Sequence, residues 1–159
     1  MKAATVYQPW ASLLAVGAKR YETRGWQTKC RGPIAIHAGL KFINSFPEYF
    51  GKIAHLELCE KLPGFAYMHN LPRGAVIATA CLLNCHLIRD DGYSKVRPEV
   101  TLTKYIQRPN YAKEYIQGCE LLFGDFTPGR YAWEFVDMKL LPEPIPARGQ
   151  QGLWEWRSA

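Results

Sequence analysis

Charged side chains are concentrated in the ten residues GAKRYETRGW, from Gly17 to Trp26. Lys19 lies three residues before Glu22, and Arg24 lies two residues after it. An arginine offers a planar fork for a phosphate or a base edge, and a lysine offers a compact charge or a catalytic proton. A glutamate can orient either cation or accept a hydrogen bond from a nucleobase amine. These residue types fit a nucleotide ligand, and they also fit an exposed ion-pair cluster on a turn.

Two predicted elements position this charged segment. Residues 2–8, KAATVYQ, predict a strand, and Trp10, Leu13 and Leu14 share one face of a short helix that follows it. Gly17 is placed to end that helix, because glycine enters the left-handed conformation without a steric penalty. The charges are therefore expected at a junction between a helix and the next strand.

Most of the remaining sequence predicts short strands, with helices early and in an insertion. Strands are expected over residues 32–38, 73–88, 130–141 and 150–156, and an amphipathic helix over residues 44–59. The helix begins with the capping-box pair Ser45 and Glu48. Its apolar side is expected to hold Phe46, Tyr49, Phe50 and Ile53. This order of elements favours an α+β fold, a small β-barrel with peripheral helices.

The strand at residues 73–88 carries side chains of opposite character on its two faces. One face is expected to hold Ile77, Cys81, Leu83, Cys85 and Leu87, and the other Asn84 and His86. Because the two cysteines then point away from the histidine, core cysteines are favoured over a metal site. No metal and no cofactor is predicted for this chain.

Tyrosines alternate with basic residues between residues 93 and 118. Pro98, Pro109 and Gly118 interrupt any long helix, so the segment near 90–118 is interpreted as an insertion with one or two short helices. Its composition fits a flap that faces RNA, and it equally fits a solvated surface.

The composition is that of an ordinary globular domain, and residues 1–159 are expected to form a single one. The formal net charge of +6 indicates a polyanionic partner or a solvated basic surface in equal measure. No run of eighteen apolar residues occurs, so no membrane association is expected. The five cysteines lack the spacing of a disulfide framework, which favours a reducing cytoplasm.

Several blocks of the sequence resemble the ASCH family, the activating signal cointegrator homology domains. Gly17, Lys19, Glu22 and Arg24 match its G-x-K-x-x-E-x-R signature. Further similar blocks, in the family's order, are YQPWASLLAVG, RGPIAIHA, RGAVIATACLLNC, FGDFTPGRYAWEF and PIPARGQQGLWEW. The resemblance is closest to compact bacterial and phage-borne members. It implies a PUA-like β-barrel of about five to seven strands, with the signature lining a cleft.

The resemblance implies binding of RNA or of a modified nucleoside or nucleotide. A first alternative is a metal-independent hydrolase, either a ribonuclease or an amidohydrolase on a modified base, with Lys19 and Glu22 as catalytic residues. ASCH-like amidohydrolases carry a threonine where this chain has Glu22, and the adjacent Thr23 is expected on the other side of the strand. A second alternative is a coregulator-type domain that contacts a protein partner.

Four further residues are candidates for contact with a ligand. Trp26 could stack a base, and His37 lies opposite the apolar face of its strand. Arg130 follows a Pro-Gly turn, and Arg148 lies beside a glycine in a loop. The alternatives are core packing for the tryptophan, a partly buried histidine, and structural turns for the arginines. For Trp10 the helical spacing favours core packing.

Overall fold

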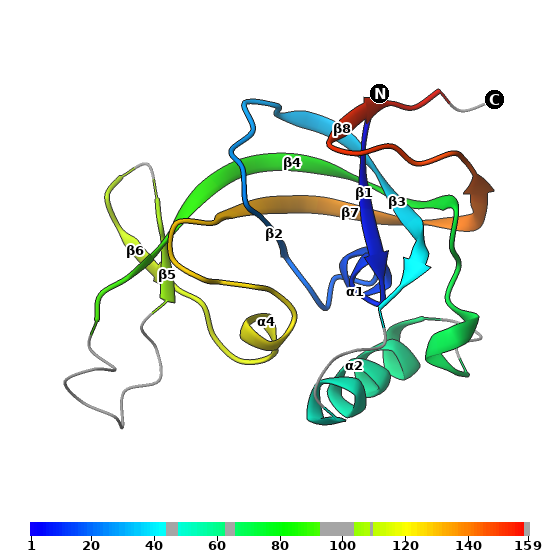
Figure 1. Ribbon diagram of the computed structural model, residues 1–159, viewed down its shortest axis with the longest axis horizontal. Helices are drawn as coiled ribbons and strands as arrows, with labels where there is room; N and C mark the ends of the chain where they lie inside the picture. Colours follow the sequence, from blue (N-terminus) through cyan, green and yellow to red (C-terminus); the bar gives the residue numbers. More distant parts are fainter. Residues whose placement is uncertain (44–47, 63–65, 93–103, 109, 158–159) are drawn as a thin grey trace.

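Eight strands form one sheet among the residues that the structure describes, which are 1–157 except 44–47, 63–65, 93–103 and 109 (Figure 1). In this computed structural model the strands are β1 (Lys2–Gln8), β2 (Tyr21–Arg24), β3 (Gly32–Phe42), β4 (Ala75–Asp90), β5 (Lys104–Gln107), β6 (Lys113–Tyr115), β7 (Tyr131–Pro146) and β8 (Leu153–Glu155). The strand order is β2-β7-β4-β3-β1-β8, with β5 beside β4 and β6 beside β5. Only β1 and β3 run parallel among these pairs.

The α+β class predicted from the sequence is confirmed, but the β-barrel is not. The path of paired strands begins with β2 and ends with β8, and no ladder joins these two strands in the described part of the chain. Both strands are short, at four and three residues, so each offers few backbone groups for a further partner.

The helices connect strands along the chain and pack beside the sheet (Figure 1). They are α1 (Trp10–Ala15), α2 (Glu48–Lys61), α4 (Cys119–Leu122) and a 3₁₀ helix (Met68–Asn70). None of the described helices is long and apolar enough to cross a membrane. α1 packs its Leu14 against Ile34, Ile77 and Trp133 in the main core, and Leu13 of the same helix packs with Phe50 of α2 in a second cluster.

The strand at β4 differs from the predicted alternation. Leu83, expected on the apolar face, is 49% exposed, whereas Leu82 and His86 are buried. The ladder between β4 and β7 shifts register at three places, the last between Leu82 and Asn84, so the side chains of β4 do not follow a strict two-residue alternation. In α2, Phe50 is buried as predicted, but Tyr49 is exposed although it was expected on the apolar side, and Ala54 and Leu58 are buried as well. Ser45 and Phe46 lie outside the described residues.

The described part of residues 93–118, interpreted from the sequence as an insertion, is a hairpin, and the predicted short helices are wrong for it. β5 and β6 pair antiparallel with Tyr105 opposite Tyr115, and Lys113 Nζ lies 4.6 Å from the centre of the Tyr105 ring. The cation and the two tyrosines therefore meet through the pairing of β5 with β6. Residues 93–103 lie outside the described part. Figure 1 shows this hairpin at one end of the long strands β4 and β7, away from β1 and β8.

Candidate functional site

The charged segment begins where the sequence predicted a helix stop. Gly17 has a φ of +72°, and its N–H donates to the Leu14 carbonyl at 2.9 Å. The Lys19 N–H donates to the Leu13 carbonyl at 3.0 Å, so the chain turns back over the end of α1. β2 follows at once and pairs antiparallel with β7, with Glu22 opposite Trp133. These local contacts fix the position of the backbone that carries the signature side chains.

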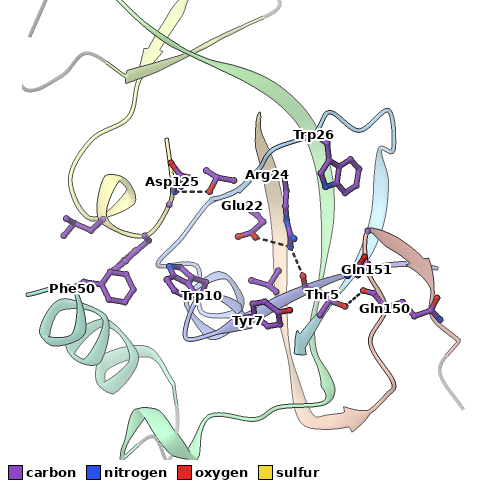
Figure 2. Close-up of a pocket in the computed structure, with 16 residues that line it drawn as sticks. Thr5, Tyr7, Trp10, Glu22, Arg24, Trp26, Phe50, Asp125, Gln150 and Gln151 are labelled. Carbon is purple, nitrogen blue, oxygen red and sulfur yellow. Dashed lines mark hydrogen bonds and ion pairs between the residues drawn. The ribbon is translucent and has the colours of Figure 1, made fainter. Parts of the chain in front are cut away.

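A cavity of about 660 Å³ lies beside β1 and β2, and Figure 2 shows the residues of its wall. Its aromatic lining consists of Tyr7, Trp10, Trp26, Phe50 and Phe123. Its polar lining consists of Thr5, Glu22, Thr23, Arg24, Asp125, Gln150 and Gln151. We call it the first cavity. Its size is that of a small-molecule site, and its wall combines large rings with a few polar groups.

Arg24 and Glu22 form an ion pair in the wall of the first cavity. Arg24 Nη2 lies 3.1 Å from Glu22 Oε1 and donates a 2.7 Å hydrogen bond to the Thr5 carbonyl (Figure 2). The guanidinium lies 5.8 Å from the centre of the Trp133 ring. Its Nε is buried without a hydrogen-bond partner among the described residues. The pair is therefore held from behind by the backbone and by an aromatic ring, with its polar edge at the cavity.

Lys19 lies behind this pair and does not line the first cavity. Its side chain is 1% exposed, its Nζ donates to the Tyr21 carbonyl, and the same atom lies 3.6 Å from Glu22 Oε2. Burial lowers the pKa of the Lys19 amine, against the opposing attraction of Glu22 and Glu120. The amine can thus reach a ligand in the cavity only through Glu22.

Aromatic faces are available at the mouth of the first cavity. Trp26 is 41% exposed and Tyr7 is 47% exposed, while both line the cavity. The Trp26 ring packs edge-on against Trp133 with ring centres 4.6 Å apart, which fixes its orientation. Trp10, expected in the core, packs against Phe50 and also lines the cavity. Tyr7 was not predicted as a site residue, because only its place in the strand at residues 2–8 was evident.

Thr23 also lines the first cavity, although alternation along β2 predicted that it points to the other side. Its hydroxyl oxygen accepts a 3.0 Å hydrogen bond from the Asp125 N–H. β2 is an edge strand, and the loop through Asp125 folds against it, so the cavity wall includes both strand faces. Arg130 Nε lies 3.1 Å from Asp125 Oδ2, and its Nη2 donates to the Thr23 carbonyl at 3.4 Å. Arg130 thus holds this turn and is not among the residues that line the cavity.

His37 and Arg148 belong to a second cavity of about 810 Å³. His37 Nε2 donates to the Ala147 carbonyl at 3.0 Å, and Nδ1 is buried without a partner among the described residues. Burial lowers the pKa of the His37 imidazole despite that hydrogen bond. Gly149 lies so close that a Cβ there would be 2.3 Å from His37 Cε1. Only glycine therefore fits at this point of the loop.

A buried ion cluster that was not predicted from the sequence lies on the side of β7 toward the hairpin. Glu134 is fully buried and accepts hydrogen bonds from His86 Nε2 and Arg108 Nη1, each at 2.7 Å, and from Arg20 Nη2. Arg20 and Arg108 both also contact Glu114. None of these residues lines either cavity. We interpret the cluster as the attachment of the hairpin to the sheet.

The cysteine and histidine side chains of β4 have separate partners. His86 is hydrogen-bonded to Glu134, and Cys85 Sγ accepts a 3.5 Å hydrogen bond from the Thr28 N–H. Within the described ranges, no group of three or more His, Cys, Asp or Glu side chains is arranged to hold a metal ion.

The structure thus combines an α+β fold with two residues of the charged signature, Glu22 and Arg24, in the wall of an aromatic cavity. The sequence profile of the ASCH domain matches residues 5–135, and the chain belongs to the ASCH domain family. A solved structure that resembles this chain is a mutant of ZmASCH from Zymomonas mobilis, with 15% identity and a TM-score of 0.47. That similarity covers 98% of this chain and 89% of the other. No curated protein sequence matches the chain.

Proposed function

We propose that the chain binds RNA or a modified nucleotide, with a base in the first cavity. The observation that carries this proposal is the Glu22–Arg24 ion pair in the wall of a cavity lined by aromatic rings. Exposed ring faces at Trp26 and Tyr7 offer stacking, which contributes about 1–3 kcal/mol per base. The Glu22 carboxylate accepts hydrogen bonds, and the Arg24 fork donates them to a base edge or a phosphate. Membership of the ASCH family, whose domains are in general associated with nucleic acids, supports the same proposal.

Replacing Arg24 by alanine is expected to weaken RNA binding by about tenfold or more, because a hydrogen bond from a charged group is worth about 1.5–3 kcal/mol. Fluorescence anisotropy of labelled single-stranded RNA across a salt series measures the effect. Binding should also weaken as salt rises, since phosphate contacts release counterions. The matched control is Lys52→Ala, which removes an exposed cation on α2 whose ion-pair partner is Glu48.

Salt-sensitive RNA binding that does not respond to Arg24→Ala, in a variant shown by circular dichroism to be folded, would remove the first cavity from the proposal. A wild-type protein indifferent to RNA that copurifies with a defined protein would favour the coregulator-type alternative.

A metal-independent hydrolase is the second candidate, and one observation favours it. Lys19 is a buried amine with a lowered pKa, directly behind the Glu22 carboxylate, and perturbed pairs of this kind support acid–base chemistry. Glu22 would be the group in contact with the substrate and Lys19 its positioning partner. The Thr23 hydroxyl, now placed at the cavity, belongs to the same candidate set for an amidohydrolase.

The hydrolase candidate predicts metal-free cleavage of end-labelled structured RNA, or deacylation of an acylated nucleoside, by wild type and not by Glu22→Gln. Lys19→Met should shift the pH profile of any residual activity, because the titrating amine is gone. Equal product from wild type and Glu22→Gln would place the activity elsewhere or in a contaminant, and no product from either would reject the hydrolase.

A further inference from the structure

The two cavities differ in the chemistry of their walls. The first has five aromatic rings and two carboxylates, Glu22 and Asp125, beside the single cation Arg24. The second is lined by two cations, Lys41 and Arg148, and by no Asp or Glu among the described residues. An aromatic wall with paired charges suits a nucleobase, whereas a wall with unopposed cations suits an anion. The two cavities therefore suit different parts of one nucleotide.

The cavities are neighbours that share part of their walls. Thr5, Tyr7, Gln150 and Gln151 line both. Two of these residues are fixed to each other, because the Thr5 hydroxyl donates to the Gln150 carbonyl at 2.9 Å. Trp154 Nε1 donates in turn to the Thr5 oxygen at 3.1 Å. Figure 2 shows Thr5 and Gln150 at the edge of the first cavity, joined by this hydrogen bond.

Residues 147–151, which include the shared lining residues Gln150 and Gln151, form a partition between the two cavities. This partition is also held from the side of the second cavity. His37 donates to the Ala147 carbonyl, and Gly149 packs directly against the His37 ring. Residues 147–151 are thus attached to β1 through Thr5 and to β3 through His37. Tyr7 and Gln150 line both cavities, so they are the residues that a ligand occupying both would contact between them.

The cations of the second cavity are available to a ligand. Lys41 and Arg148 are exposed, and neither makes a hydrogen bond or an ion pair with another residue in the described part of the chain. By contrast, Arg20, Arg24, Arg108 and Arg130 all have carboxylate partners. Both residues line the same cavity. A lysine binds phosphate through its compact ammonium charge, and an arginine binds it through two parallel N–H donors.

We propose that the second cavity binds a phosphate carried by the nucleoside whose base occupies the first cavity. This inference rests on the proposed function and makes the ligand a nucleotide, free or within a strand, rather than a nucleoside. Lys41 and Arg148 contact the phosphate, and Tyr7 and Gln150 lie along the sugar between the two sites. The phosphate adds affinity through charge-assisted hydrogen bonds, about tenfold for one well-placed contact.

The test compares three kinds of probe by isothermal titration calorimetry: the four ribonucleosides, their 5′- and 3′-monophosphates, and single-stranded RNA pentamers. Wild type should bind the phosphate-bearing probes about tenfold more tightly than the nucleosides. Lys41→Ala/Arg148→Ala should lose this gain while its affinity for nucleosides stays unchanged. The matched control Lys139→Ala/Arg157→Ala removes one exposed lysine and one exposed arginine that line neither cavity, and it should keep the gain.

The outcomes separate the inference from the proposed function. A phosphate gain that is equal in all three proteins would overturn the inference and leave base binding in the first cavity in place. Wild type that binds none of the probes would overturn both. A gain already present with monophosphates assigns the phosphate to a free nucleotide, and a gain seen only with pentamers assigns it to an RNA backbone.

Discussion

Replacing Glu134 by alanine is expected to lower the free energy of unfolding by about 3–5 kcal/mol, the cost of removing one partner from a buried charge cluster. The carboxylate is fully buried and accepts hydrogen bonds from His86, Arg108 and Arg20. Without it, two guanidinium groups and an imidazole face one another, and Glu114 is the carboxylate left beside the two arginines. Urea denaturation followed by circular dichroism measures the loss.

The pH dependence of the same variant provides a second readout. Burial alone would raise the pKa of Glu134, but hydrogen bonds from Arg108, His86 and Arg20 outweigh it and lower the pKa to about 2. A carboxyl whose pKa is depressed on folding contributes stability above its ordinary pKa of 4.5, and this stability is lost as the pH falls from there toward 2. The difference in stability between wild type and Glu134→Ala should therefore shrink across that range.

Glu143→Ala is the matched control for Glu134→Ala, because Glu143 lies on the same strand, β7, and is exposed. It should change stability by less than about 0.5 kcal/mol. Amide hydrogen exchange should show β5 and β6 loosening first in Glu134→Ala, since Arg108 and Glu114 belong to the hairpin. Full stability of Glu134→Ala at neutral pH would show that the cluster does not fasten the hairpin to the sheet.

Glu22→Gln is expected to lower stability at neutral pH by about 3 kcal/mol, because it leaves the buried Lys19 amine without its carboxylate partner. The Lys19 side chain is 1% exposed, and Glu22 Oε2 lies 3.6 Å from its Nζ. Arg24 loses its carboxylate partner as well, but it is more exposed and keeps the Thr5 carbonyl. The main cost therefore falls on the lysine.

Stability of the Glu22→Gln variant should also rise with pH more steeply than that of wild type. Burial lowers the pKa of Lys19 below its ordinary 10.5, so the unfolded chain binds more protons between the folded pKa and 10.5. Stability rises with pH wherever the unfolded state binds more protons. Removing the attraction of Glu22 lowers the folded pKa further and extends this window toward neutral pH.

The double variant Glu22→Gln/Lys19→Met isolates the amine, because it has no group left to titrate at that position. Denaturation midpoints measured from pH 7 to 10 should show the extra slope in Glu22→Gln and its disappearance in the double variant. Glu48→Gln, which removes an exposed carboxylate paired with Lys52, should follow wild type. The same slope in all the proteins would mean that Glu22 does not hold the charge on Lys19.

Features that depend on neighbours in the sequence were predictable. β1 covers the predicted residues 2–8, and Gly17 adopts the positive φ that a helix stop requires. Glu22 and Arg24 lie where a short helix gives way to a strand, and that junction follows from apolar spacing and one glycine. The junction brings both side chains to the first cavity.

Features that depend on distant contacts were not predictable. Burial of a lysine runs against the general preference of that residue for water, so nothing in the sequence predicts that Lys19 lies behind the cavity wall and not in it. The hydrogen bond from His86 to Glu134 joins residues 48 apart in the sequence, and that from Arg20 to Glu134 joins residues 114 apart. One signal was present: Glu134 stands inside the apolar run YAWEFV, where a carboxylate needs partners.

The pairing of β1 with both β3 and β8 has a consequence for the newly made protein. The signature residues leave the ribosome early, but Gln150, Gln151 and Gly152 of the same cavity wall leave it more than a hundred residues later. Until β8 pairs with β1, the wall has no far side and the partition between the cavities is absent. A chain in which β8 has not yet paired with β1 would therefore lack the site that we propose for the ligand. The proposed ligand would stabilise only chains in which this pairing has formed.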